Sequence, residues 1–182
     1  MSGDKHSAAL TVRGMVFTAL FTAVTCALAP FSIAVGPIPL SLATFAVYLA
    51  AGTQGLKTGV LSIALYVLLG AVGLPVFANF EGGLHKLAGV TGGFIIGYIP
   101  CAAVIGYMTE TFSSRLLSYI TGMVLGTVLL YGCGMAWFML QTGNTFATSL
   151  ILCVAPFLPG DAIKIAAAYA IAPRLRAAIR LL

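Results

Sequence analysis

The sequence predicts an all-α membrane protein with six transmembrane helices in a single domain, residues 1–182. Of these residues, 60% are hydrophobic and 7% are charged, whereas an average soluble domain is about 45–50% apolar and about 25% charged. The charged residues leave four long uncharged segments, which are residues 14–56, 58–80, 87–109 and 116–160. Because a spanning helix needs about 20 apolar residues, the two shorter segments hold one helix each and the two longer segments hold two each.

Prolines and glycines divide the first half of the chain into three helices. Residues 36–39, Gly-Pro-Ile-Pro, interrupt the first apolar segment, because two prolines two positions apart cannot lie inside a helix. We therefore expect helices over residues 8–30 and 40–53, the first retained and not cleaved as a signal peptide. A glycine-rich turn then leads into a third helix over residues 58–72, which a Gly-Leu-Pro sequence ends.

A long outer loop is expected over residues 74–92, between the third and fourth helices. This segment is the most polar in the interior of the chain, and its polar side chains belong to Asn79, Glu81, His85, Lys86 and Thr91. Its glycines allow the backbone to approach a ligand closely. Long loops in compact domains are usually functional, so the loop is a candidate binding element, and we rate Glu81 and Asn79 above His85 and Lys86.

The last three helices are less regular. We expect helices over residues 93–109 and 116–139, followed by a half-helix between breaks at residues 141–144 and 156–159. The final helix has only fourteen residues, 160–173, before a proline, which is about 21 Å of helix against a hydrocarbon core of about 30 Å. It must therefore begin inside the membrane or continue past the proline with a kink.

The distribution of basic residues predicts that both termini are cytoplasmic. With the N-terminus inside, the cytoplasmic side collects seven of the nine basic residues, which are Lys5, Arg13, Lys57, Arg115, Arg174, Arg176 and Arg180. The outer side has Lys86 alone, and Lys164 lies within a span. Basic residues concentrate on the cytoplasmic side of membrane proteins, so the outer loops are residues 31–39, 74–92 and 140–159.

Asp161 and Lys164 are the strongest candidates for chemistry, because they lie on one face near the start of an otherwise apolar span. Either charge costs about 2.5–3.5 kcal/mol at the centre of a spanning helix, so each must face a cavity or the other. One interpretation is a structural ion pair. The other is a polar binding site at a helix N-terminus that opens on a cavity, as in transporters with broken helices.

Small residues predict a close helix contact on the first helix, where Ala19, Ala23 and Ala27 recur every four positions. Gly122 and Gly126 do the same in the fifth helix. Such faces allow helices to approach closely. In the fifth helix the simplest interpretation is internal packing.

Several classes of function have no support in the sequence. A net charge of +5 does not form a nucleic-acid surface on a chain whose surface faces lipid. The four cysteines lack metal-ligand spacing, so we expect free thiols and no metal site. The chain contains no hydrolase, zinc-protease or phosphate-loop motif. A pore would need polar residues repeated along one helix face, and the helices lack them.

Four segments resemble the BioY family of biotin-specific S-components: residues 36–39, 66–78, 89–94 and 158–164. The Gly-Leu-Pro-Val-Phe-Ala sequence within the second segment is specific to the family, and the resemblance covers nearly the whole chain. It implies a six-helix subunit of the prokaryotic cytoplasmic membrane that binds biotin from outside. It also implies partners, a transmembrane coupling protein and two ATPases, which form an energy-coupling factor transporter with it, and no cofactor.

The resemblance further implies that Ala19, Ala23 and Ala27 contact the coupling protein, and that the 74–92 loop and the start of the last helix close over biotin. The chain departs from the family pattern at three positions. Ala43 replaces the usual Gln, Val90 replaces a Pro, and Phe94 replaces a Tyr. The first of these removes an amide from the outer end of the second helix.

The chemistry of biotin fits these candidates. Asp161 can accept hydrogen bonds from the ureido N–H groups, and Lys164 can donate to the ureido carbonyl or neutralise the carboxylate. Aromatic walls with polar tips would come from Tyr48 and Tyr66. Backbone N–H groups at the start of the fourth helix could hold an anionic or carbonyl end, and these belong to Thr91, Gly92 and Gly93. The alternatives are another vitamin, or a membrane-embedded enzyme that uses Asp161 and Lys164.

Overall fold

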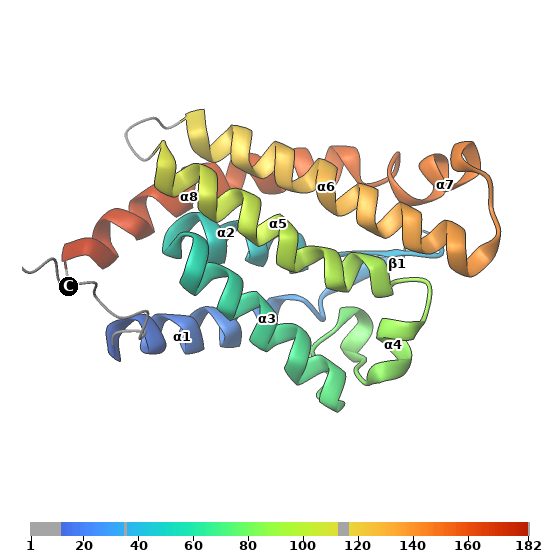
Figure 1. Cartoon of the computed structure of the whole chain (residues 1–182), viewed down its shortest axis with the longest axis horizontal. Coiled ribbons are helices and arrows are strands. Elements are labelled where there is room, and N and C mark those ends of the chain that lie inside the picture. The colour runs from blue at the N-terminus through green and yellow to red at the C-terminus, as the bar shows by residue number, and fades with distance from the viewer. Residues whose placement is uncertain (1–11, 35, 113–116, 182) are drawn as a thin grey trace, which may run out of the picture.

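The computed structural model describes residues 12–34, 36–112 and 117–181, and most of them are helical (Figure 1). The elements in chain order are α1 (Val12–Leu28), β1 (Ser32–Ala34), β2 (Pro39–Ser41), α2 (Ala43–Gln54), α3 (Leu56–Val72), the 3-10 helix η1 (Ala78–Phe80), α4 (Leu84–Ala88), α5 (Gly92–Thr111), α6 (Leu117–Thr142), α7 (Phe146–Cys153) and α8 (Leu158–Leu181).

Helix α2 forms the centre of the bundle. It packs against α1, α3, α5 and α8, and ten of its twelve residues are buried. A helix that is apolar on every side is buried on every side, and the many small residues of α2 let four neighbours approach it. The long helices α5 and α6 pack against each other on one side of this centre.

The turn between α2 and α3 depends on Gly55, whose φ of 87° is in the left-handed region that favours glycine. A side chain there would also collide with Glu110, whose carboxylate accepts a hydrogen bond of 2.9 Å from the backbone N–H of Leu56. On α6, Gly122 and Gly126 pack against α5 near Ile105. This contact confirms the internal packing predicted for these two glycines.

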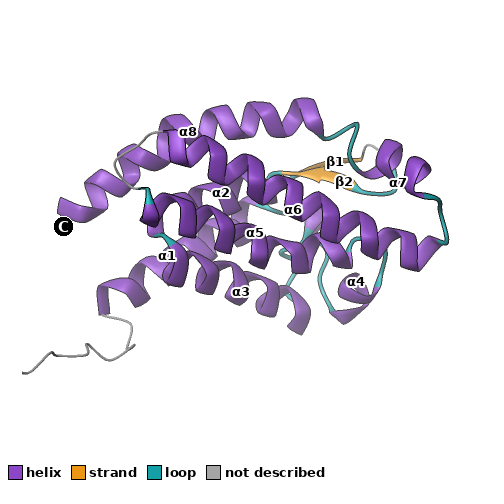
Figure 2. Ribbon diagram, turned by 45° about the horizontal axis from the view of Figure 1, so that its top comes forward, coloured by secondary structure: helices purple, strands orange, loops and turns teal. Residues whose placement is uncertain are grey.

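The expected helices are present, with three differences. The sequence predicts a loop over residues 31–39 and a helix from residue 40, but β1 and β2 form a short antiparallel hairpin, with Ser32 paired to Ser41 (Figure 2). Helix α2 therefore begins later than predicted, at Ala43. The 74–92 connection contains η1 and α4, which the sequence did not predict. The last helix continues through Pro173 to residue 181. Its 24 residues form a helix of about 36 Å, which is longer than the hydrocarbon core of about 30 Å.

Two helices, α5 and α6, are long and apolar enough to cross a membrane by themselves. A third candidate span consists of α7 and α8, which meet at a bend of 50°, where the sequence predicted a half-helix followed by the last helix. The apolar helices α1 and α3 have 17 described residues each, and α2 has twelve. Residues 8–11 of the predicted first helix lie outside the described residues. The expectation of six spans therefore stays a prediction.

Candidate binding site

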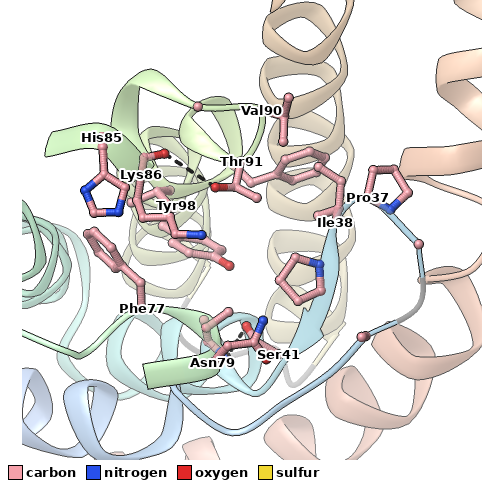
Figure 3. A pocket seen from close by; sticks show the side chains of 18 of the residues that line it. Pro37, Ile38, Ser41, Phe77, Asn79, His85, Lys86, Val90, Thr91 and Tyr98 are labelled. Atoms are coloured by element: carbon pink, nitrogen blue, oxygen red, sulfur yellow. Dashed lines mark hydrogen bonds between the residues drawn. The ribbon is translucent and has the colours of Figure 1, made fainter. Parts of the chain in front are cut away.

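A cavity of about 300 Å³ lies at the end of the bundle opposite the C-terminus (Figures 1 and 3). Its walls come from the β1–β2 hairpin, the connection between α3 and α5, and the first half of α5. The larger apolar side chains on the walls are Ile38, Tyr66, Phe77, Phe94 and Ile95, and the polar ones are Ser41, Asn79, His85, Lys86, Thr91 and Tyr98. Such a mixture suits a small ligand with an apolar body and several polar groups.

Asn79 attaches the α3–α5 connection to the hairpin. Its φ is 62°, which asparagine tolerates better than most residues. Its Oδ1 accepts a hydrogen bond of 2.8 Å from the Ser32 hydroxyl, and its backbone N–H donates to the Pro30 carbonyl at 3.0 Å. The side-chain amide group of Asn79 donates to no described residue, so its two N–H groups remain available at the cavity wall.

Lys86 brings a positive charge to the cavity from α4. It forms an ion pair with Glu81, and both side chains keep contact with solvent, with exposed fractions of 32% and 39%. Glu81 itself does not line the cavity. The backbone carbonyl of Lys86 accepts a hydrogen bond of 3.4 Å from the Thr91 hydroxyl, a contact that Figure 3 shows beside the cavity.

Three aromatic rings form the deeper part of the cavity. The ring of Tyr66 meets Phe77 edge-on, with 5.7 Å between centroids, and lies 6.4 Å from the ring of Tyr98. Gly70 on α3 leaves room for Phe77, because a side chain at that position would collide with the ring. Tyr98 and Ser41 of β2 border the cavity together. The Tyr66 hydroxyl has no hydrogen-bond partner among the described residues, so it can serve a ligand.

Asp161 and Lys164 form the ion pair that their spacing predicted, with 2.9 Å between Oδ1 and Nζ. The other Asp161 oxygen, Oδ2, accepts a hydrogen bond of 2.6 Å from the Tyr131 hydroxyl. Lys164 also donates to the Ser41 carbonyl at 2.7 Å and to the Thr44 hydroxyl at 2.9 Å. All three ammonium protons therefore have acceptors. The network joins α8 to β2, α2 and α6.

This ion pair does not line the main cavity. It borders a much smaller void of about 30 Å³, and the two spaces share the walls formed by Pro39, Ser41, Phe94 and Tyr98. Asp161 and Lys164 thus lie one layer behind the cavity wall, on the far side of β2. Whether they contact a ligand stays a prediction.

The remaining predicted residues divide into two groups. Asn79, Thr91 and Tyr66 line the cavity, whereas Tyr48, Gly92 and Gly93 do not. Tyr48 is fully buried, and its hydroxyl lies 2.5 Å from that of Thr127 on α6.

Gly92 and Gly93 pack against Trp137 of α6, where a side chain at either position would collide with neighbouring atoms. The indole N–H of Trp137 donates a hydrogen bond of 2.9 Å to the Gly89 carbonyl. The two glycines therefore hold the start of α5 against α6.

Several cavity residues had no signal in the sequence. Ser41 lies in the predicted second helix and Tyr98 in the predicted fourth, but Ser41 belongs to β2 and borders the cavity beside Tyr98. The three positions at which the chain departs from the BioY pattern, Ala43, Val90 and Phe94, all line the cavity. The three departures from the family pattern were therefore the sequence signal for this wall of the cavity.

Ala19, Ala23 and Ala27 lie on α1 and are all exposed. Beside them, Val16 and Leu20 are also exposed, at 59% and 51%. Helix α1 therefore has an uncovered apolar face with small residues along it. None of these residues lines the cavity.

The chain is similar to known biotin transporters along nearly its whole length. The model of the BioY family matches residues 4–181. A "Biotin transporter BioY" of Thermotoga maritima is 40% identical over 91% of this chain and 96% of its own length. A "Probable biotin transporter BioY" of Pyrococcus horikoshii is 40% identical over 92% of this chain and 98% of its own length.

The structure of the chain is also similar to that of a protein described as a biotin S-component. A crystal structure of the S-component for biotin from an ECF-type ABC transporter superposes with a TM-score of 0.84. It shares 27% sequence identity, and the match covers 92% of this chain and 95% of the other. The chain therefore belongs to the BioY family.

Proposed function

We propose that this chain is the substrate-binding membrane subunit of a biotin importer. The observation that carries the proposal is the mixed polar and apolar cavity beside the β1–β2 hairpin, in a chain whose relatives and structural neighbour are described as biotin transporters and as a biotin S-component. Since those proteins are transporters, a membrane-embedded enzyme that uses Asp161 and Lys164 is not favoured, and neither is an S-component for another vitamin.

The proposed topology has six spans, with both termini in the cytoplasm and the cavity facing outward, in a multi-pass protein of the prokaryotic cytoplasmic membrane. Its support is the position of the basic residues, because the start of α1 carries Arg13, the start of α3 carries Lys57, and the last part of α8 carries Arg174 and Arg176. These three segments lie at the end of the bundle opposite the hairpin and α4 (Figure 1). Basic residues favour the cytoplasmic side. In this arrangement α7 and α8 form one broken span.

We propose that biotin binds with its carboxylate toward Lys86 and its ureido ring toward Tyr66 and Tyr98. Lys86 keeps 32% of its side chain exposed, whereas Tyr66 and Tyr98 are 1% and 9% exposed. The charged end of the ligand thus stays near water, where its desolvation costs least. The free amide of Asn79 is placed to bind the carboxylate, and the rings of Phe77 and Phe94 to cover the apolar thioether ring.

The Asp161–Lys164 pair has a positioning role in this proposal. Lys164 donates a hydrogen bond to the Ser41 carbonyl, and Ser41 borders the cavity beside Tyr98. The pair therefore fixes the back of the cavity wall from α8. At the front of the cavity, Glu81 forms an ion pair with Lys86 and competes with the ligand carboxylate for its ammonium group.

The exposed apolar face of α1 is the proposed contact surface for the membrane-embedded coupling protein of the transporter, which two ATPases would energise. Ala19, Ala23 and Ala27 allow a partner helix to approach closely, and no described element of the chain covers them. The surface is separate from the cavity, so docking does not block the ligand.

Mass spectrometry of the small molecules released from the detergent-purified chain tests the function directly. We expect biotin, retained from the expression host, in the denatured sample. A variant with Tyr98→Trp, which fills the cavity, should release none. Release of a different vitamin from the wild-type chain, without biotin, would contradict the assignment of the substrate and leave the fold unchanged.

A further inference from the structure

A second polar pocket lies at the opposite end of the molecule from the biotin cavity. Its walls come from the start of α1, the α2–α3 turn and the last part of α8, and its polar side chains belong to Arg13, Thr53, Gln54, Thr58 and Arg176. The space measures about 350 Å³. Neither the proposed biotin site nor the alanine face of α1 includes it.

The two arginines of this pocket lack carboxylate partners among the described residues. Arg176 is only 9% exposed, and its Nη1 donates to the backbone carbonyls of Gly52 at 3.5 Å and Thr109 at 3.1 Å. Its Nε and Nη2 groups donate to no described residue. Arg13 is exposed, and its guanidinium lies 5.9 Å from the ring of Phe17. A poorly solvated cation is costly without an anion, so this pocket favours an anionic ligand.

Two buried polar atoms beside the arginines also lack partners. The Thr53 hydroxyl and the Gln54 Oε1 form no hydrogen bond with the described residues, although Thr53 is only 3% exposed. Other buried threonines here, such as Thr25 and Thr127, donate to the carbonyl four residues earlier. The Thr53 hydroxyl can donate to a ligand and the Gln54 oxygen can only accept, so a ligand that both accepts and donates hydrogen bonds would pair both atoms.

The remaining walls of the pocket are apolar. Phe17 and Ile179 border it, and Phe17 lies one turn after Arg13 on the same face of α1. The pocket therefore forms a track from a charged end to an apolar end. An amphiphile fits such a track better than a free anion does.

We propose that this pocket binds an anionic glycerophospholipid, such as phosphatidylglycerol, from the adjacent leaflet. Arg13 and Arg176 bind the phosphate, which suits the guanidinium geometry. The Thr53 hydroxyl donates to a phosphate oxygen, and a hydroxyl of the headgroup donates to Gln54. The part of one acyl chain next to the headgroup packs on Phe17 and Ile179. This inference goes beyond biotin capture and does not depend on it.

Native mass spectrometry of the purified chain tests the proposal. The chain is mixed with equal amounts of phosphatidylglycerol and phosphatidylcholine that carry the same acyl chains. We expect retention of phosphatidylglycerol in preference, because choline cannot donate to Gln54 and adds a positive charge beside the arginines. Arg13→Gln and Arg176→Gln should each lower this retention by about ten-fold, as expected for the loss of one charged hydrogen bond.

Arg174→Gln is the matched control, because Arg174 is exposed two residues from Arg176 and does not line the pocket. It should retain the lipid as the wild-type chain does. Arg13 is exposed, so its substitution tests the pocket even if Arg176→Gln fails to fold.

Equal retention of the two lipids, or unchanged retention in Arg13→Gln, would overturn the proposal. Displacement of the lipid by millimolar inorganic phosphate would also overturn it, in favour of a soluble anion. A third result would also overturn the proposal: the wild-type chain retains no lipid, and Arg13→Gln prevents assembly with the coupling protein. In that case an acidic group of the partner would occupy the pocket.

Discussion

The two ion pairs of the described residues, Asp161–Lys164 and Glu81–Lys86, have opposite surroundings. Asp161 and Lys164 are nearly buried, with side-chain exposures of 5% and 11%, and every proton of the ammonium group has an acceptor. Glu81 and Lys86 are about one-third exposed, and only their mutual contact holds them. Lys164 has no ammonium proton left for a ligand, because all three are bound within the protein. Lys86 is partly exposed at the cavity, so it can bind a ligand. The comparison therefore gives the first pair a positioning role and the second pair a binding role.

The largest expected effect comes from breaking the buried pair on one side. Asp161→Leu leaves Lys164 charged and without its counter-ion in a poorly solvated site, which costs about 3–5 kcal/mol of folding free energy. Thermal unfolding in detergent should show a much lower midpoint. Tyr131→Phe is the matched control, because it removes one hydrogen bond to the Asp161 carboxylate and should cost less, about 1.5–3 kcal/mol.

The double variant Asp161→Leu/Lys164→Met sharpens the comparison. Removal of both charges should restore most of the stability, and the variant should still bind biotin, because the cavity wall remains. A stable double variant that binds no better than the weaker single variant would show instead that these side chains contact the ligand.

An intermediate effect is expected at the exposed pair. Lys86→Met removes the cation proposed to bind the carboxylate, so biotin affinity should fall by about 1.5–3 kcal/mol, roughly ten- to a hundred-fold. Folding stability should change by less than about 1 kcal/mol, since exposed ion pairs contribute little. Calorimetric titration with biotin measures the first quantity and thermal unfolding the second.

Glu81→Gln is the matched variant of the same pair. It frees Lys86 from its competing carboxylate, so affinity for biotin should rise, by less than about ten-fold. If Glu81→Gln weakened biotin binding as much as Lys86→Met does, both members of the ion pair would be needed for binding. That result would contradict the proposed contact between Lys86 and the biotin carboxylate.

The smallest effect on the isolated chain is expected on α1. Ala23→Trp places a large ring on an exposed face that does not border the cavity, so biotin affinity should stay within about two-fold of wild type. Co-purification with a coupling subunit should nevertheless be lost, because the ring blocks close approach of a partner helix. Intact assembly would remove the alanine face from the proposed interface.

The sequence predicted the helices well, because the segments between its glycines and prolines are apolar enough to leave few alternatives. It also predicted the contact between Asp161 and Lys164, since residues three apart share a helix face. The hairpin was missed because strands of three residues, one with a proline, carry no period-two pattern.

The cavity wall was harder to predict for a different reason. Tyr66 and Tyr98 lie on separate apolar helices, and hydropathy does not say which side of an apolar helix faces inward. Gly92 and Gly93 were predicted to approach a ligand, but Trp137, which is more than forty residues later in the chain, packs against them. Only the pairing of α5 with α6 places that ring.

The central claim is that the cavity beside the hairpin binds biotin with its carboxylate at Lys86. The most direct measurement is a calorimetric titration of the wild-type chain and Lys86→Met with both biotin and biotin methyl ester, which lacks the negative charge. The account predicts that Lys86→Met weakens binding of biotin by roughly ten- to a hundred-fold and leaves binding of the ester nearly unchanged. An equal loss for both ligands, or no loss for either, would contradict it.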